Sequence, residues 1–579
     1  MNRCDLSLGV VVLAALAHLA VNLRGVQVDG AAEYSYSGAR QSLRRVQTAG
    51  IRGRILARDG SSLAENRACV SIVCDAAPLR AKTYLKTADN IEASLVRLSD
   101  LLGREIPLAH TNIYHHVKSQ TAVPLVIWRN LGEDDIARFA ENSRLFPGFS
   151  LSCSAQRRYP MGAAVGHLTG YVGRSRGNAV AGDQRFYSYA PEMVGRAGLE
   201  AYYDDYLRGV SGDDRVLVDS LGYAVRHWTV VAPQKGPDLV ITIDPKLQLA
   251  AMRELSGCRG ACVVMDPRNG EVLAMASSPS FDPNVFVPFI TDEEYSRLRD
   301  DSQLPLLNRA VNGTYAPGST FKPITAIAGL SLGYPELHRY ECSGVYQLAE
   351  LSLRCSRRWG HGELDLRHAL MASCNPFFCN LGMDVGTNQL LSVARDFGLG
   401  SRTGIDFPAE PSGVVPDAEW KWKNYRERWY PGDLAQLSIG QGMLLVSPLQ
   451  MARVAGALGT GYLTTPHLRY GAEVRREVLP FSRQHLRIVQ EGMRMVVTGE
   501  GHIRGTGWRG GEGVPVHVSG KTGTAEIGSR ANRRKNTWFI AYAPSENPSV
   551  AVALVVENGE SGGSTAAPRC ANILRECFR

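Results

Sequence analysis

One apolar run near the start of the chain determines on which side of a membrane the rest of the chain is expected to fold. Residues Leu6–Leu23 read LSLGVVVLAALAHLAVNL, with Arg3 before them and Arg24 after them. Eighteen helical residues extend roughly 27 Å at about 1.5 Å each, close to the hydrocarbon thickness of a bilayer. No second run of this kind follows. We therefore expect everything after about residue 25 to fold on the far side of a membrane.

Two interpretations of this run are open. Ala15-Leu16-Ala17 resembles the small-residue site of a cleavable signal peptide. The absence of proline, and of glycine beyond Gly9, favours an uncleaved anchor helix instead. On that interpretation residues 1–24 form a cytoplasmic stub and a single transmembrane signal anchor.

Length and charge narrow the function classes. With 579 residues the chain is too long for one ordinary core, so we expect more than one domain. The net charge of +8 is spread over the whole length, without a dense Lys/Arg run and interleaved aromatic residues. A nucleic-acid-binding function therefore has little support.

Residues 25–235 form the first exported block. Ile51–Asn66 reads IRGRILARDGSSLAEN, where Arg58-Asp59-Gly60 predicts a turn between two strands. Gly195–Gly209 reads GRAGLEAYYDDYLRG and predicts an amphipathic helix after a glycine-rich turn. Nothing in this block combines a nucleophile, a base and an electrophile, so we expect an extended, non-catalytic α+β pedestal.

A second unit, residues 236–579, begins near Gly236. Asp244 and Pro245 predict the N-cap and first position of a helix, and Asn269-Gly270 predicts a hairpin turn. Strands at both ends of the unit with helical material between them indicate a mixed α/β domain, whose sheet joins distant parts of the chain. The predicted elements are strands at Leu239–Asp244, Val516–Glu526, Asn536–Pro544 and Val550–Asn558, a hairpin within Ala261–Ala276, and helices at Pro245–Leu255 and Ala567–Cys577.

A serine and a lysine in this unit carry the first chemical signal. In YAPGSTFKPITAIAGL (Tyr315–Leu330) a Pro-Gly turn precedes a helical pattern, so Ser319 and Lys322 lie one turn apart at a helix N-terminus. A serine hydroxyl needs a neighbouring base, and a buried lysine can be that base. Taken alone, the pair is far more typical of a capped helix with a solvated lysine.

Two further motifs strengthen the signal. Ser373-Cys374-Asn375 opens a turn, and Lys521-Thr522-Gly523-Thr524 lies on a predicted strand. Lys521 supplies a positive charge, Thr522 can hold a carboxylate, and Gly523 would let a substrate backbone approach closely. Ser-x-x-Lys, Ser-x-Asn and Lys-Thr-Gly in this order are the signature of penicillin-binding proteins and class A β-lactamases.

From about residue 50 to the end the chain resembles a class B penicillin-binding protein. The resemblance implies a transpeptidase domain of the penicillin-binding/β-lactamase type, with an antiparallel sheet and helices. Gly360–Phe378 and Trp429–Gly442 resemble the elongation-type members more than the division-specific ones. The segments that carry the resemblance are RGRILARDGSSLAEN, RRYP, GLEAYYDDYLRG, VVMDPRNGEVLAMASSPSFDPN, NRAVNGTYAPGSTFKP, SIGQGMLLVSPLQMA and SGKTGTAE.

The resemblance implies a role for each motif. Ser319 matches the acylated nucleophile, Lys322 the general base and Ser373 the proton-shuttling serine. The remaining matches are Asn375, which orients the substrate amide, Lys521 and Thr522, which clamp the terminal carboxylate, and the backbone N–H groups of Ser319 and Thr524, which form the oxyanion hole.

The implied activity is cross-linking of peptidoglycan stem peptides that end in D-Ala-D-Ala, with β-lactams as acylating mimics and no cofactor for the acyl transfer. The implied location is the cytoplasmic (inner) membrane, with the catalytic domain in the periplasm. We find no glycosyltransferase-type acidic motif in residues 25–235, so polymerisation would need a SEDS-family glycosyltransferase and other elongation-complex proteins as partners. Rival functions are a β-lactamase, which would hydrolyse its acyl-enzyme quickly, and a β-lactam-binding sensor or silent scaffold.

Three cysteines and a histidine that could bind a metal lie between the first motif and the middle of the second. Cys342, Cys355, His361 and Cys374 would suit a closed tetrahedral zinc site, and some elongation-type relatives bind zinc at matching positions. The role would be structural. A Cys342–Cys355 disulfide and free buried thiols are the alternatives, and Cys379 is the substitute ligand.

Overall fold

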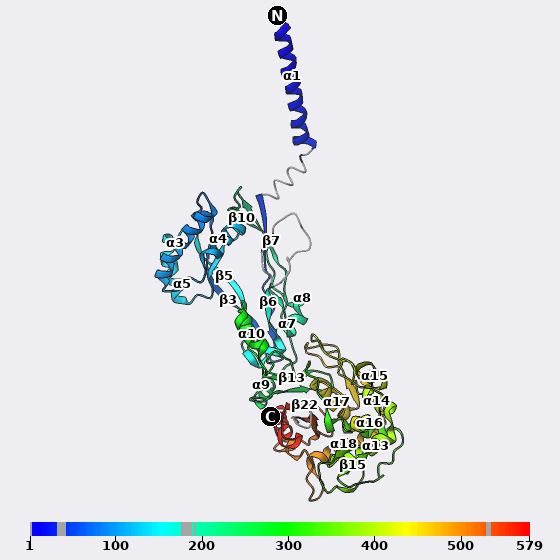
Figure 1. Cartoon of the computed structure of the whole chain (residues 1–579). Coiled ribbons are helices and arrows are strands. Elements are labelled where there is room, and N and C mark those ends of the chain that lie inside the picture. Colours follow the sequence, from blue (N-terminus) through cyan, green and yellow to red (C-terminus); the bar gives the residue numbers. More distant parts are fainter. Residues whose placement is uncertain (1–2, 30, 32–41, 175–187, 190–192, 529–533) are drawn as a thin grey trace.

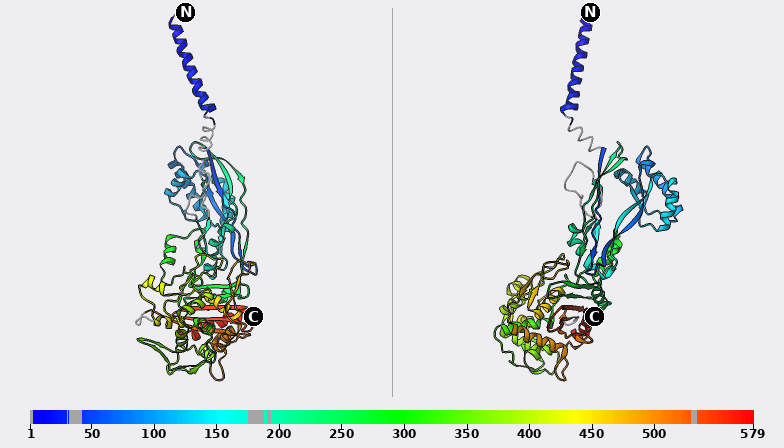
Figure 2. Two further views of the ribbon diagram at one scale, coloured as in Figure 1. Left: turned by 90° about the vertical axis from the view of Figure 1, so that its right-hand side faces the viewer. Right: turned by 180° about the vertical axis from the view of Figure 1, so that it is seen from behind.

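The computed structural model describes residues 3–29, 31, 42–174, 188–189, 193–528 and 534–579. The molecule is elongated. Figures 1 and 2 show three parts in a row: an isolated N-terminal helix, a narrow middle part, and a larger globular part that holds the C-terminus.

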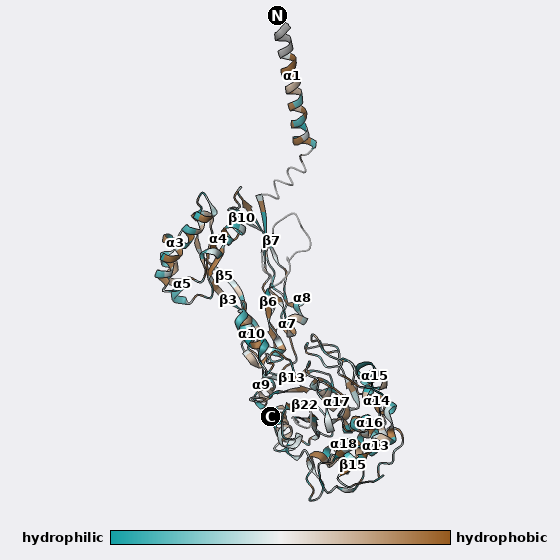
Figure 3. Cartoon of the chain, in the orientation of Figure 1, coloured by the Kyte–Doolittle hydropathy of each residue, from teal (hydrophilic) through white to brown (hydrophobic). Residues whose placement is uncertain are grey.

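The isolated helix is α1 (Arg3–Arg24), which runs into the π-helical turn η1 (Gly25–Asp29). Among the described residues it is the one helix long and apolar enough to cross a membrane. Its apolar side chains are left uncovered by the rest of the chain; Val10 is 62% and Leu13 69% exposed. Figure 3 shows these hydrophobic residues along a helix without neighbours. An uncovered apolar helix of this length is consistent with a single-pass membrane anchor.

Two sheets build the middle part, the pedestal. The sheet next to α1 has the strand order β10-β9-β1-β7, and the second has the order β11-β2-β3-β4, with β5 also pairing with β3. The first comprises β1 (Leu43–Thr48), β7 (Ser188–Tyr189), β9 (Gly212–Val218) and β10 (Ala224–Val231). The second comprises β2 (Ile55–Leu56), β3 (Ser62–Cys74), β4 (Leu125–Trp128), β5 (Phe149–Arg158) and β11 (Leu239–Val240).

Helices α3 (Tyr84–Leu102), α4 (His110–Ser119) and α5 (Glu133–Asn142) pack beside β3 and β4 around one apolar core. The predicted turn between β2 and β3 is confirmed, because Gly60 has a φ of +83° and its N–H donates to the Ala57 carbonyl. The shorter pedestal elements are β6 (Val172–Arg174), β8 (Met193–Gly195), α6 (Gly166–Thr169), α7 (Gly198–Tyr202), α8 (Asp204–Leu207), η2 (Ala77–Leu79), η3 (Ser143–Leu145) and η4 (Gly162–Ala164).

The helix predicted within Gly195–Gly209 is divided into α7 and α8. Arg52 explains the break, because its Nη2 donates to the Glu200 carbonyl at 2.7 Å and takes an acceptor that a continuous helix would use. The Glu200 side chain is fully buried and pairs with Arg52 at 2.5 Å and Arg157 at 2.7 Å. A buried carboxylate between two buried guanidinium groups fixes this segment against the rest of the pedestal.

The sheet of the globular part has five antiparallel strands in the order β13-β12-β22-β21-β20. Strands from residues 260–278 thus pair with strands from 519–557, as the sequence pattern predicts. The predicted strand at Leu239–Asp244 differs: only Leu239–Val240 is a strand, and it pairs parallel with β2 of the pedestal. The bounds are β12 (Gly260–Met265), β13 (Val272–Ser278), β20 (Ser519–Ile527), β21 (Arg534–Ala543) and β22 (Val550–Glu557).

Helices cover both faces of this sheet, which is why its central strands are continuously apolar. Terminal helices α9 (Pro245–Glu254) and α19 (Ala567–Cys577) lie on one face and α17 (Pro448–Thr460) on the other. The remaining helical and 3-10 elements are η5 (Pro283–Phe286), α10 (Asp292–Asp300), η6 (Gly318–Phe321), α11 (Lys322–Ser331), α12 (Leu366–Met371), α13 (Asn375–Val385), α14 (Thr387–Asp396), α15 (Ala418–Tyr425), α16 (Pro431–Ser438), α18 (Arg483–Thr498) and η7 (Trp508–Gly511), with the π-helical turn η8 (Gly562–Ala566). The domain also has three small two-stranded sheets: β14 (Tyr340–Cys342) with β17 (Gly362–Leu364), β15 (Val345–Leu348) with β16 (Leu351–Arg354), and β18 (Tyr462–Thr464) with β19 (Arg476–Val478).

Candidate active site

Ser319 lies in the tight 3-10 turn η6, three residues before α11 begins at Lys322. The turn is held against the sheet at both ends. Thr320 Oγ1 donates to the Pro317 carbonyl at 2.8 Å, and the Trp538 indole of β21 donates to the Ala316 carbonyl at 3.0 Å. The hydroxyl of Ser319 is partly exposed and makes no hydrogen bond to any other described residue. It is therefore placed as an available nucleophile on a fixed backbone.

Lys322 is fully buried behind the turn, at the start of α11. Its Nζ donates to the Ser373 carbonyl and to Asn375 Oδ1, both at 2.7 Å, and lies 3.4 Å from Ser373 Oγ. Burial lowers the pKa of this amine to about 8, although the nearby cysteine thiols oppose the shift. A lysine with such a pKa is neutral often enough at neutral pH to accept a proton.

Ser373 has a φ of +54°, a left-handed conformation that is strained for a residue with a Cβ. Its hydroxyl lies between two buried lysines, because Lys521 Nζ of β20 donates to Ser373 Oγ at 2.8 Å. Complete burial, together with the neighbouring Lys322 amine, holds the pKa of Lys521 well below its usual range. The structure thus brings the three motifs together around one serine hydroxyl.

Lys521–Thr524 occupies the β20 strand that flanks the nucleophile turn. Thr522 is 7% exposed, and the Gly562 N–H donates to Thr524 Oγ1 at 3.2 Å. The fold itself also requires glycine at position 523: a Cβ there would lie 2.8 Å from the Pro317 carbonyl oxygen and 2.8 Å from Thr320 Cγ2. Glycine at this position makes room for the turn that holds Ser319.

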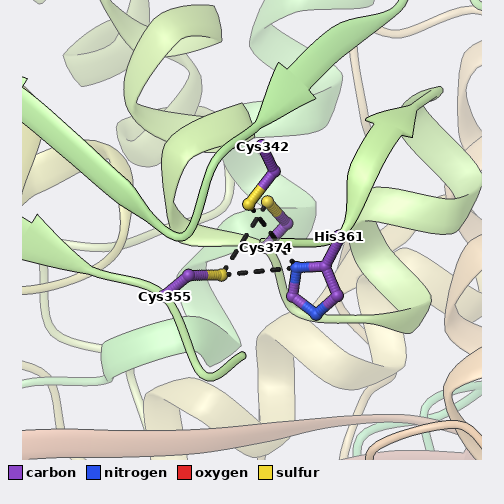
Figure 4. A group of neighbouring side chains, drawn as sticks. All are labelled: Cys342, Cys355, His361 and Cys374. Atoms are coloured by element: carbon purple, nitrogen blue, oxygen red, sulfur yellow. Dashed lines mark hydrogen bonds between the residues drawn. The ribbon is translucent and has the colours of Figure 1, made fainter. Parts of the chain in front are cut away.

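The four predicted metal ligands gather at one point, as Figure 4 shows. They come from the end of β14, the loop after β16, the residue before β17 and the residue before α13. The Sγ atoms of Cys342 and Cys355 lie 3.6 and 3.4 Å from His361 Nδ1, and the Cys355 and Cys374 Sγ atoms are 4.0 Å apart. All four donor atoms lie within 4.8 Å of one another.

This spacing fits a tetrahedral ion. Zn–S bonds of about 2.3 Å and a Zn–N bond of about 2.0 Å place S···S pairs about 3.8 Å apart and S···N pairs about 3.5 Å apart. The cysteines whose side chains are described are free thiols, so the disulfide alternative is not realised. Cys379 lies outside the group and donates to the Ala435 carbonyl. The contact between the Cys355 and Cys374 thiols lowers the pKa of the Cys355 thiol and raises the pKa of the Cys374 thiol.

The cysteine group touches the second motif directly. Cys374 precedes Asn375, and the Asn375 amide donates to the carbonyl of Arg354, the residue before Cys355, at 2.7 Å. The other side of the Asn375 amide accepts from Lys322. The orientation of the Asn375 amide is therefore set jointly by Lys322 and by the segment that carries Cys355.

Thr506 was not found by the sequence reasoning. It lies between α18 and η7, and the Thr522 hydroxyl donates to its Oγ1 at 3.1 Å. Two flanking glycines are the only local signal, and they do not distinguish it from other turns. Thr506 becomes a candidate functional residue only because the fold places it in contact with Thr522 of the third motif.

Comparisons with known proteins agree with this geometry. Residues 260–575 match the family model described as "Penicillin binding protein transpeptidase domain", and residues 47–241 match "Penicillin-binding Protein dimerisation domain". The chain is 33% identical to "Peptidoglycan D,D-transpeptidase MrdA" of Escherichia coli K12, over 98% of this chain and 92% of that protein. It is 31% identical to the protein of the same name from Acinetobacter baumannii, over 98% and 86% of the two chains.

Solved structures give the same result. A complex between the penicillin-binding protein PBP2 and MreC from Helicobacter pylori has a TM-score of 0.76 at 27% identity, covering 93% of this chain and 99% of that one. PBP2 of Pseudomonas aeruginosa in complex with WCK 5153 has a TM-score of 0.66 at 29% identity, with coverages of 92% and 96%. A peptidoglycan synthase complex that couples polymerisation and cross-linking has a TM-score of 0.73 at 30% identity, with coverages of 99% and 98%.

Proposed function

Because this chain belongs to the penicillin-binding protein family and is a peptidoglycan D,D-transpeptidase, we propose that its acyl transfer runs through Ser319 with Lys322 as the general base. The observation that carries the assignment is the Ser373 hydroxyl, held between the Nζ atoms of two fully buried lysines beside the Ser319 turn. An arrangement of this kind can move a proton without a metal or cofactor.

The first half of the reaction forms an ester. Ser319 Oγ attacks the carbonyl carbon of the penultimate D-Ala, and its proton passes to the neutral Lys322 amine. The backbone N–H groups of Ser319 and Thr524 stabilise the resulting oxyanion. The C–N bond then breaks, and the leaving D-Ala amine takes its proton from Ser373. Lys521 and Lys322, both within hydrogen-bond reach of Ser373 Oγ, replace that proton.

The second half reverses these proton movements. An amine of a neighbouring stem peptide attacks the ester carbonyl and loses a proton to the same relay, which restores the Ser319 hydroxyl as the cross-link forms. The terminal carboxylate of the donor peptide is held by Thr522 and Lys521. An incoming carboxylate favours the protonated form of Lys521, so the low pKa of the free site does not prevent this clamp.

The test is covalent labelling of the full-length, detergent-purified protein with a fluorescent penicillin. We expect labelling of the wild type and none of Ser319→Ala, with thermal unfolding showing that the variant is folded. Persistent labelling of a folded Ser319→Ala would reject Ser319 as the nucleophile. Rapid release of hydrolysed penicillin by the wild type would instead indicate a β-lactamase.

We also propose that Cys342, Cys355, His361 and Cys374 hold a structural zinc ion. Bound zinc would supply a rigid link between the β14–β17 lobe and the second motif, without an open coordination position. The three distances close to those of a tetrahedral site support the assignment. Elemental analysis should find about one zinc per chain, reduced by Cys355→Ser. The proposal would be refuted if the wild-type protein contained no zinc and if thiol and imidazole reagents modified all four side chains.

The anchor, the pedestal and the partners form one proposal. We assign residues 1–24 to a single-pass anchor in the inner membrane, 25–235 to the pedestal and 236–579 to a periplasmic transpeptidase domain. On this proposal the pedestal and anchor contact an MreC-like protein and a SEDS-type glycosyltransferase. One similar structure is a complex of PBP2 with MreC and another is a peptidoglycan synthase complex, which supports partners of these two kinds. Affinity purification of the full chain from cross-linked membranes should recover both. Recovery of neither, from cells that contain them, would count against the proposal.

A further inference from the structure

We infer that Thr506 is a positioning residue of the transpeptidase reaction, which orients the hydroxyl of Thr522 toward the substrate carboxylate. This inference rests on the proposed function, in which Thr522 binds that carboxylate. Thr506 lies outside the three sequence motifs but connects Thr522 of the third motif to Met371, two residues before the second. Its Oγ1 donates to the Met371 carbonyl at 3.2 Å and accepts from Thr522 Oγ1 at 3.1 Å.

The position of Thr506 is fixed from several sides. A Cβ on Gly505 would lie 2.2 Å from the Val496 carbonyl oxygen, and one on Gly507 would lie 2.8 Å from the Phe539 ring. A Cβ on Gly563 would lie 2.5 Å from the Thr506 carbonyl oxygen. The glycines allow the loop to lie tightly between α18, β21 and η8, so the threonine hydroxyl is not free to move with a flexible loop.

The hydrogens available to these groups allow two arrangements. Each threonine hydroxyl has one hydrogen, and the Met371 carbonyl can only accept. In the observed arrangement the Thr506 hydroxyl donates to the Met371 carbonyl, and the Thr522 hydroxyl donates to Thr506. The Thr522 oxygen then presents lone pairs to the site, which a carboxylate would not bind.

In the second arrangement Thr506 rotates its hydrogen toward Thr522, whose own hydrogen becomes free for the carboxylate. The Met371 carbonyl keeps a partner during this exchange, because the Thr506 backbone N–H also points to it at 3.4 Å. A hydroxyl that receives a hydrogen bond is a stronger donor, and donation to an anion is the stronger kind of bond. When the carboxylate binds, Thr506 therefore donates a hydrogen bond to the Thr522 oxygen, and the Thr522 hydroxyl donates its own hydrogen to the carboxylate.

Met371 ends α12, two residues before Ser373. The same threonine thus ties the carboxylate clamp on β20 to the segment that carries the proton-shuttling serine. Among the described residues, the Thr506 side chain hydrogen-bonds to Met371 and Thr522 and to neither lysine, so Thr506 acts through Thr522.

The experiment measures the second-order acylation rate constant for a penicillin and for its carboxylate methyl ester. Thr506→Val keeps the β-branched shape but loses the hydroxyl, and Thr506→Ser keeps the hydroxyl. We expect Thr506→Val to slow acylation by the penicillin about tenfold and acylation by the ester less than about twofold. Thr506→Ser should stay close to the wild type with both compounds.

A double-mutant comparison separates this inference from the proposed function. Thr506→Val should add no further loss in a Thr522→Val background, because its effect passes through Thr522. An equal loss with both compounds would assign Thr506 a merely structural role. If Thr522→Val slows the penicillin selectively and Thr506→Val does not, the inference fails while the clamp stands; if Thr522→Val has no selective effect, the clamp itself fails.

Discussion

Replacing Gly523 by alanine tests whether the nucleophile turn is positioned by its contact with β20. The new Cβ would lie 2.8 Å from the Pro317 carbonyl oxygen, 2.8 Å from Thr320 Cγ2 and 3.0 Å from Trp538 Cβ. To reach ordinary contact the turn must retreat by about half an ångström. Pro317 also accepts the Thr320 hydrogen bond that closes the turn around Ser319, so the nucleophile moves with it.

A displacement of this size, with about 1 Å corresponding to a hundredfold loss of rate, should slow acylation roughly tenfold or more. The assay is the second-order rate of labelling by fluorescent penicillin, with the folded fraction measured by thermal unfolding. We expect unfolding to become easier by about 1–3 kcal/mol as well, because the packed turn is forced apart.

Gly456→Ala in α17 is the matched control. Its Cβ would meet Pro267 Cβ at 2.7 Å, a contact that involves no residue of the candidate site. The control should lose stability similarly but label at the wild-type rate once folded. A Gly523→Ala rate within about threefold of the wild type would show that this contact does not position Ser319.

Three further predictions concern the base, the pedestal and the metal lobe. The acylation rate should rise with pH and level off above a midpoint near 8, since Lys322 must be neutral to act as a base and burial lowers its pKa to about 8; a flat profile from pH 6 to 9 would contradict this role. Glu200→Gln should destabilise the protein by about 3–5 kcal/mol in urea unfolding, because it leaves Arg52 and Arg157 buried without their shared carboxylate; a loss below about 1 kcal/mol would show that the pair is not needed. Removal of bound zinc with a chelator should slow penicillin labelling by about tenfold, and added zinc should restore the rate, because the Asn375 amide is held by the carbonyl next to Cys355. Unchanged labelling of the metal-free protein would show that the cysteine group does not support the active site.

The sequence predicts the catalytic sheet well because its signals are local. The turn at Asn269-Gly270, the cap at Asp244 and the apolar runs of β21 and β22 each express a preference of a few neighbouring residues. The predicted closing helix, Ala567–Cys577, has the same bounds as α19. The three motifs could be found because each is a short, contiguous pattern.

The remaining features depend on contacts that no local pattern contains. The break between α7 and α8 is caused by Arg52, far away in the sequence, and the function of Gly523 is set by a turn some two hundred residues earlier. Thr506 is a threonine between glycines until the fold places it on Thr522. The cysteine group could be proposed from its residue types, but its tetrahedral spacing required the lobe to fold.

The backbone of Ser373 is held from two sides, by the helix α12 and by the cysteine group. Its positive φ is of a kind that costs about 1–3 kcal/mol, so neighbouring structure must hold it there. On one side the helix α12 does so, through hydrogen bonds from the N–H groups of Ser373 and Cys374 to the Leu370 and Ala369 carbonyls. On the other side Cys374 enters the cysteine group. If the strain is what aims the hydroxyl between two lysines, an ion bound by Cys374 acts on catalysis by fixing a backbone angle.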